Sequence, residues 1–186
     1  MDNLKFNYRN TYHHLYNRGI DRNAIFFEEY DYQYFLRKTR ECKEKYSVNV
    51  NCYCLLPNHF HLFVKQLKNE FSVGRFIGTL TNSYTKGINK KYGRTGMLFE
   101  GRTKNKLITD DKYFLFLCKY IINNPVNAGL VKNPEDWKYS SAGKYFDISE
   151  DNITDEKEII EMFKSTDDFV SFVNKKEIVF DYSQIF

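Results

Sequence analysis

The sequence contains few of the residues that break or cross-link a chain. There are three prolines and four cysteines in 186 residues, and we find no proline-rich linker, low-complexity tract or internal repeat. No apolar run is long enough to cross a membrane, and no segment has the pattern of a signal peptide. These features argue against a disulfide-stapled secreted domain and against a membrane protein. We therefore expect a cytoplasmic protein without a membrane partner.

The cysteines also lack the spacing of a thiolate metal site. They occupy four positions: Cys42, Cys52, Cys54 and Cys118. No pair has the Cys-x-x-Cys spacing that is typical of zinc sites and redox motifs, so we expect reduced thiols. In an extended segment, Cys52 and Cys54 would share a strand face with Val48 and Val50. This pattern favours packing in the core over zinc binding.

Charge is distributed unevenly along the chain. Residues 147–186 contain eleven acidic residues and four lysines, although the formal net charge of the whole chain is +4, so residues 1–146 are strongly basic. Seven basic residues lie between residues 82 and 107: Lys86, Lys90, Lys91, Arg94, Arg102, Lys104 and Lys106. A solvated helix face usually alternates charges for pairing, but Glu100 is the only acid in this segment. A polyanion is therefore the expected partner, and aromatic residues, 18% of the chain, could stack on nucleic-acid bases.

Two histidines stand one residue apart in the apolar segment LPNHFHLF, residues 56–63. On a β-strand, residues i and i+2 point to the same face about 6.5 Å apart, so both imidazoles could reach one ion. The alternation agrees with a strand, because Phe60 and Leu62 fall on one face and His59 and His61 on the other. A pair on a helix would usually have i, i+4 spacing, as in zinc proteases. The alternative is a buried, hydrogen-bonded histidine beside a half-exposed one.

Hydrophobic periodicity predicts an alternation of strands and helices. We expect strands at residues 11–17 and 48–55, a histidine-bearing strand after a turn at residues 57–58, helices at 29–46, 73–92 and 110–124, and a loop or hairpin at 96–108. Pro125 is expected to stop the last of these helices. This order is typical of an α+β sandwich with an antiparallel sheet. Residues 137–142 would cap this domain, and the acidic segment would add one or two helices.

A second group of candidate residues lies on the helix predicted at residues 110–124. Tyr120 and Asn124 are i, i+4 neighbours, so a phenol and an amide would project from one face. Two imidazoles and an amide oxygen leave coordination positions open, which suits Mg²⁺ or Mn²⁺ holding phosphate oxygens better than a closed structural zinc site. Tyr120 is one of 15 tyrosines, so a core aromatic is the alternative interpretation. Tyr84, on the preceding helix, is a rival nucleophile.

Five segments together resemble a known family. In chain order they are YHHLYNRG (12–19), LPNHFH (56–61), GMLFEGR (96–102), KYIINNPVNAGL (119–130) and DWKYSS (136–141). This series resembles the HUH-type single-tyrosine transposases of bacterial insertion sequences, and most closely their REP-associated branch. The resemblance extends over residues 11–146, about three quarters of the chain. It divides the chain into a transposase domain at residues 1–146 and an acidic C-terminal extension at residues 147–186.

The resemblance implies a ferredoxin-like fold and a metal-dependent endonuclease and strand transferase that acts on single-stranded DNA near hairpins. His59 and His61 match the motif of the metal ligands, and Asn124 matches the polar third ligand. Tyr120 matches the tyrosine that forms a 5′-phosphotyrosine intermediate. The expected cofactor is Mg²⁺ or Mn²⁺, and the basic residues between Lys86 and Lys106 would contact DNA phosphates.

Several alternatives remain open from the sequence. The same chemistry would serve a replication-initiator-like nickase or a domesticated enzyme, and a non-catalytic nucleic-acid-binding module would retain the histidines as structural residues. The resemblance allows either a homodimer or a monomer. The acidic extension could mediate association or mimic DNA, although ordinary packing is favoured. His13 and His14 adjoin the site, but adjacent strand residues face opposite ways and cannot both join it.

Overall fold

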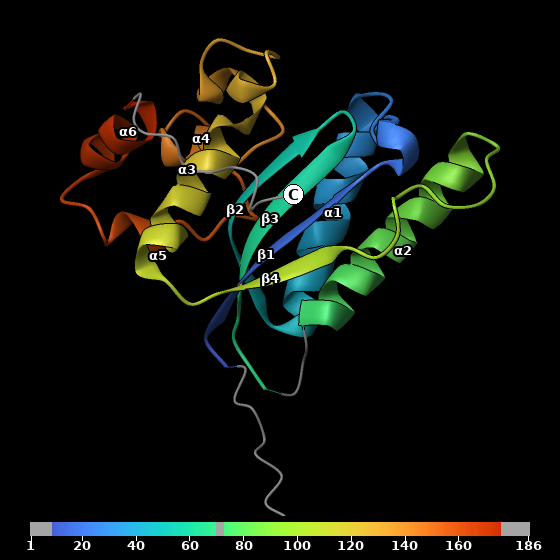
Figure 1. Ribbon diagram of the computed structural model, residues 1–186, viewed down its shortest axis with the longest axis horizontal. Helices are drawn as coiled ribbons and strands as arrows, with labels where there is room; N and C mark the ends of the chain where they lie inside the picture. Colours follow the sequence, from blue (N-terminus) through green and yellow to red (C-terminus); the bar gives the residue numbers. More distant parts are fainter. Residues whose placement is uncertain (1–8, 70–72, 176–186) are drawn as a thin grey trace, which may run out of the picture.

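The computed structural model describes residues 9–69 and 73–175, which form one antiparallel sheet with helices on both faces (Figure 1). The strands are β1 (Thr11–Arg18), β2 (Val48–Leu56), β3 (His59–Gln66) and β4 (Lys104–Ile108), in the spatial order β2-β3-β1-β4. The main helices are α1 (Glu29–Tyr46), α2 (Val73–Lys91) and α3 (Asp111–Asn127). Short helices follow at α4 (Ala142–Tyr145), α5 (Lys157–Ile160) and α6 (Thr166–Asn174). The predicted α+β, ferredoxin-like architecture is therefore confirmed.

The sheet separates two hydrophobic cores. Helices α1 and α2 cover one face and enclose the first core, whereas α3 and the C-terminal helices lie on the other face and enclose the second (Figure 1). Phe60 and Leu62 of β3 belong to the first core, and Phe63 belongs to the second, as the alternation predicts. The histidines therefore face α3. Among the described helices, none combines the length and the hydropathy that a membrane crossing requires.

Strand β2 contributes to both cores because it contains a β-bulge. Its pairing with β3 shifts in register between Val50 and Cys52. Val48 and Val50 consequently lie in the first core, and Cys52 and Cys54 in the second. The prediction that these four residues share a face is wrong, because the extra residue Asn51 interrupts the alternation. Core packing of both thiols is confirmed, and burial raises the pKa of each.

The outer edge of β2 is covered by the segment that follows α3. The indole Nε1–H of Trp137 donates to the carbonyl of Leu55 at 2.9 Å, and the backbone N–H of Leu55 donates to Tyr139 O at 2.9 Å. The N–H of Ser141 donates to Tyr53 O at 3.0 Å. Backbone groups that an edge strand would otherwise present to solvent are thus paired, and the predicted capping role of residues 137–142 is confirmed.

Helix α3 continues past the proline that was expected to stop it. Its first turn is capped by Asp110, whose side chain accepts a hydrogen bond from the N–H of Tyr113 at 2.7 Å. Pro125 lies within the last turn, where its missing N–H removes one helical bond. The N–H groups of Ala128 and Leu130 donate to the carbonyls of Asn124 and Pro125, both at 2.9 Å, and these bonds keep the turn closed.

The described part of the acidic extension, residues 147–175, packs on the fold: Ile153 lies in the first core beside β2, and α6 lies against α3. Three apolar side chains of the extension are buried in the second core: Ile159, Phe169 and Val173. The Nζ of Lys119 on α3 donates to the carbonyls of Phe172 and Lys175, both at 2.7 Å. Asn123 Nδ2 donates to Val173 O at 3.2 Å. The described residues of the extension therefore pack as an ordinary part of the fold, which is the role that the sequence favoured.

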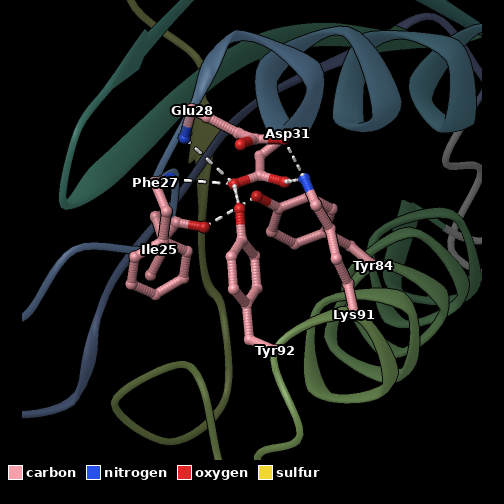
Figure 2. A network of polar contacts seen from close by, with 7 residues as sticks. All are labelled: Ile25, Phe27, Glu28, Asp31, Tyr84, Lys91 and Tyr92. Atoms are coloured by element: carbon pink, nitrogen blue, oxygen red, sulfur yellow. Dashed lines mark hydrogen bonds and ion pairs between the residues drawn. The ribbon is translucent and has the colours of Figure 1, made fainter.

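On the other side of the sheet, a buried carboxylate joins the start of α1 to the end of α2 (Figure 2). Asp31 accepts hydrogen bonds from the N–H groups of Phe27 and Glu28, at 2.9 and 3.2 Å, and from the Tyr92 hydroxyl at 2.8 Å. Lys91 Nζ completes the set at 2.7 Å. Burial raises the pKa of Asp31, but Lys91 and the other donors outweigh burial, so the net effect lowers the pKa below its ordinary value.

Replacing Asp31 by asparagine should lower the free energy of unfolding by about 2 kcal/mol near neutral pH, because charge-assisted hydrogen bonds are lost. A carboxyl whose pKa is depressed in the folded state contributes stability above its unfolded pKa of about 3.9, and this stability is lost as the pH falls through the folded value. The difference between the variant and the wild type should therefore shrink below about pH 4. Urea unfolding of both proteins at neutral and acidic pH measures this difference in unfolding free energy.

The control for this substitution is Glu41→Gln, on the same helix, where the side chain is 47% exposed. It should change the unfolding free energy by less than about 0.5 kcal/mol. A difference between Asp31→Asn and the wild type that stays constant from neutral to acidic pH would contradict the role assigned to the Asp31 carboxylate.

Candidate functional site

The two histidines of β3 lie on the face of the sheet that α3 covers. In the strand register, His61 is opposite Tyr16 and His59 is opposite Arg18. His61 is fully buried, and His59, the first residue of β3, is partly exposed. Their rings lie edge to face with centroids 5.2 Å apart. The i, i+2 spacing therefore brings both imidazoles to one place, as the sequence predicts.

Helix α3 brings the other two predicted residues to the same place. The ring of Tyr120 meets that of His61 edge to face, with centroids 5.4 Å apart. The amide oxygen of Asn124 lies 3.1 Å from Nε2 of His59. Tyr120 and Asn124 are 7% and 5% exposed, so one turn of helix presses both against the sheet. All four residues meet within a single chain.

Burial keeps the imidazoles of the site neutral at physiological pH. It lowers the pKa of His59, and the Arg18 charge adds to this effect while the contact with Asn124 opposes it. Burial also lowers the pKa of His61 well below its ordinary value, assisted by His14 and His59. A neutral imidazole has one nitrogen lone pair, which is the form that binds metal ions.

The arrangement around His59 fits a bound cation. Its Nδ1 lies 2.7 Å from Asn58 Oδ1, and in the tautomer whose Nδ1–H donates there, Nε2 carries the lone pair. That lone pair faces the amide oxygen of Asn124 at 3.1 Å. Two acceptors at this distance repel one another unless a proton or a cation lies between them, and the low pKa of His59 disfavours the proton. The donor set of two imidazoles and an amide oxygen therefore suits a divalent ion.

A fifth residue, His14, joins the site from β1. Its Nε2 lies 2.9 Å from Nδ1 of His61, and the two rings stack with centroids 5.2 Å apart. Burial lowers the pKa of His14 to about 3, and the charge of Lys106 contributes. His13 faces the other way, where its Nδ1 lies 2.9 Å from Asn105 Oδ1. The sequence shows that only one of this pair can join the site, but the choice depends on strand register.

Comparisons with known proteins show the family of the chain and match its fold. The family model for IS200-like transposases matches residues 7–124, more than half of the chain. The chain belongs to the IS200-like transposase family. A curated relative from Haemophilus influenzae, named as a REP-associated tyrosine transposase, is 29% identical over 131 residues, which are 65% of this chain and 73% of the relative. A solved structure of a REP-associated tyrosine transposase bound to a REP hairpin has the same fold, with a TM-score of 0.64 and 16% identity over 78% of this chain and 91% of that one.

Tyr84, the rival nucleophile, lies on the opposite side of the sheet from the histidines. It is fully buried in the first core on α2, and its hydroxyl donates to the carbonyl of Ile25 at 2.7 Å (Figure 2). Burial raises the pKa of Tyr84 far above its ordinary value. The phenol is therefore separated from the histidines by the sheet and is poorly suited to attack a substrate.

The seven basic residues between Lys86 and Lys106 are divided between the layers. Lys86, Lys90 and Lys91 belong to α2, Arg94 and Arg102 to the loop that follows, and Lys104 and Lys106 to β4. Register places Lys104 beside Tyr16 and Lys106 beside His14, on the face of the histidines. Lys91 is instead paired with Glu28 and Asp31 at 2.5 and 2.7 Å. The seven side chains thus do not form one surface, and DNA binding by each stays a prediction.

Proposed function

We propose that this chain is a metal-dependent endonuclease and strand transferase for single-stranded DNA, with Tyr120 as the nucleophile. One observation carries the proposal: a phenol, two neutral imidazoles and an amide oxygen converge on one face of the sheet, in a chain of the IS200-like transposase family. The alternatives that the sequence allows, a nickase for replication or a domesticated enzyme, would use the same step.

The metal would be held by His59, His61 and Asn124. Mg²⁺ or Mn²⁺ is the expected ion because a set of two nitrogens and one oxygen leaves positions for phosphate oxygens and water. When bound, such an ion would polarise the scissile phosphate and stabilise the charge on the leaving oxygen. His61 and His59 would serve as ligands without first losing a proton, since burial keeps both neutral.

The covalent step exchanges one phosphodiester for another. The phenolic oxygen of Tyr120 attacks phosphorus, the phenol loses its proton to solvent, and a bond forms between that oxygen and phosphorus. The bond from phosphorus to the 3′ oxygen breaks, and the 3′ oxygen takes up a proton to become a hydroxyl. The product is a 5′-phosphotyrosine and a free 3′ end. Attack by another 3′-hydroxyl reverses the step and joins a new strand without a nucleotide cofactor.

The proposed substrate is single-stranded DNA that carries a hairpin. The hairpin is suggested by the solved structure with the same fold, which is bound to a REP hairpin. Lys104 and Lys106 lie on the face of the histidines and would contact phosphates near the cleaved bond. Arg102 lines an open groove of about 720 Å³ between α2 and the loop before β4, and it would contact phosphates farther away. Since one chain supplies all four site residues, we propose that a monomer carries out the reaction. The proposed location is the cytoplasm.

The proposal is tested by incubating the protein with single-stranded oligonucleotides from both flanks of its gene. Reactions with Mg²⁺, with Mn²⁺ and with a chelator are compared on a denaturing gel, on which a covalent protein–DNA adduct migrates apart from free DNA. An adduct that requires the metal supports the proposal. Tight binding that survives chelation and yields no adduct on any flank would overturn it in favour of a non-catalytic binding module.

His14 is expected to act on the metal through His61. For His61 to bind a cation through Nε2, its Nδ1 must carry the proton and donate it to His14 Nε2 at 2.9 Å. Replacing His14 by alanine should weaken Mn²⁺ binding by about 10- to 100-fold, the usual effect of losing such a partner. Calorimetric titration with Mn²⁺ measures this without DNA.

The matched control for His14 is His13→Ala, because His13 precedes it on the same strand and faces the first core. The control should bind Mn²⁺ within about twofold of the wild type. Equal affinities of the His14 and His13 variants would show that His14 does not orient His61.

A further inference from the structure

A row of side chains continues the histidine face of the sheet toward its β4 edge. Tyr16 and Arg18 are two residues apart on β1 and therefore point to the same side. In the register, Tyr16 lies between His61 of β3 and Lys104 of β4, and Arg18 lies opposite His59. The reaction proposed above leaves Tyr16 and Arg18 without a role.

These side chains line a cavity of about 280 Å³ beside the candidate metal site. Its lining residues are Tyr16, Asn17, Arg18, Glu100 and Lys104. The cavity thus combines an aromatic ring with two cations and one carboxylate. Proteins that bind single-stranded nucleic acid use rings to stack on bases and cations to follow the phosphates. The composition therefore fits one nucleotide of a single strand.

The aromatic ring of this cavity is held in place by the site. The Tyr16 ring lies 4.6 Å from that of His14 at an angle of 30° and 6.0 Å from that of His61 at 25°. Side chains that are already ordered lose less freedom when a ligand binds. Tyr16 is consequently a preformed platform, and its position links the cavity directly to His61.

The charge in the cavity is partly neutralised by the protein. Arg18 Nε forms an ion pair with Glu100, and their side chains are 40% and 46% exposed. An exposed pair of this kind contributes little to the free energy of folding, so a phosphate can replace the carboxylate on Arg18 with little loss of free energy. The N–H of Glu100 also donates to the carbonyl of Arg18 at 2.8 Å, which keeps the carboxylate nearby. Glu100 is thus placed as a competitor for phosphate.

We propose that this cavity binds one nucleotide of single-stranded DNA next to the scissile phosphate. Tyr16 stacks on the base, Arg18 and Lys104 bind the adjacent phosphates, and Glu100 lowers the affinity until a phosphate displaces it. The inference rests on the proposed function and names the substrate contacts of the same site. It also gives a reason for preferring single strands, because the bases of a duplex are already stacked and cannot enter.

The test measures binding of a labelled single-stranded oligonucleotide from the flank of the gene by fluorescence anisotropy. Chelator and the Tyr120→Phe background keep the DNA uncleaved. Tyr16→Leu should weaken binding by about 5- to 150-fold, and Tyr16→Phe by less than about twofold, because only the former removes the ring.

Glu100→Gln should tighten binding and steepen the slope of log Kd against log salt by roughly 0.7. Arg18→Gln and Lys104→Gln should weaken binding and reduce that slope by a similar amount.

The control for loss of one positive charge is Lys157→Gln, since Lys157 is 81% exposed on α5. It should leave the salt slope unchanged. Equal affinity of Tyr16→Leu and its parent, or weaker binding by Glu100→Gln, would overturn the inference, as would an equal effect of Tyr16→Leu on duplex DNA. Failure of the proposed function is a separate result: it would appear as the absence of a covalent adduct in the chain with Tyr120 intact, whatever the anisotropy shows.

Discussion

Replacing Tyr120 by phenylalanine should abolish the covalent protein–DNA adduct and reduce strand cleavage by more than about 10³-fold, as loss of a catalytic nucleophile does elsewhere. The substitution removes one oxygen and keeps the ring, so the edge-to-face contact with His61 at 5.4 Å is retained. Binding of single-stranded DNA should therefore stay within a few-fold of the wild type. The adduct on a denaturing gel and the affinity by anisotropy separate the chemical step from binding.

Tyr84→Phe is the matched control, because it removes the same atom from a tyrosine on the other side of the sheet. The adduct should form as in the wild type. The variant should lose about 1 kcal/mol of unfolding free energy, since the carbonyl of Ile25 loses a buried hydrogen bond of 2.7 Å. An adduct that persists in Tyr120→Phe, or one that disappears only in Tyr84→Phe, would refute the assignment of the nucleophile.

The second large effect is expected at His61. Replacing it by glutamine should reduce Mn²⁺ affinity by more than about 100-fold and eliminate adduct formation at moderate metal concentration. Removing a direct metal ligand weakens metal binding more than removing a residue that only orients a ligand. Glutamine is chosen because it is polar and of similar size, and His61 is fully buried. Electron paramagnetic resonance of free Mn²⁺ reports binding, and the gel reports the reaction.

Two comparisons make the His61 result specific. His13→Gln, on the neighbouring strand but facing the first core, should bind Mn²⁺ as the wild type does. A melting temperature for His61→Gln within a few degrees of the wild type would show that the fold is retained. If that folded variant formed the adduct at wild-type metal concentrations, the proposed ligand set would be wrong.

Much of this architecture is predicted by sequence patterns of short period. The period-2 alternation around His59 and His61 predicts both the strand and the face on which the imidazoles lie. The i, i+4 spacing of Tyr120 and Asn124 predicts that one helix face carries both. These patterns are local, because each depends on the geometry of a single element. The predictions from these patterns are confirmed because each pattern involves only one strand or one helix.

The features that the sequence did not reveal are those that depend on pairing between elements. The bulge at Asn51 adds one residue to β2, and no local period shows whether an extra residue is accommodated. The choice of His14 over His13 follows from the register of β1 with β3. The basic residues between Lys86 and Lys106 are close along the chain, but a helix, a loop and an edge strand distribute them across both layers.

The packing of α6 on α3 also affects when the site can form during synthesis. The first core is composed of residues up to Ile153, so it can assemble before the C-terminal helices α5 and α6 pack. The helix that bears Tyr120 shares its core with Phe169 and Val173, which emerge last among the described residues. A chain without α6 would therefore have a folded sheet, but the helix that carries Tyr120 would lack part of its packing. The proposed cleavage of DNA would therefore depend on α6 as well as on the sheet.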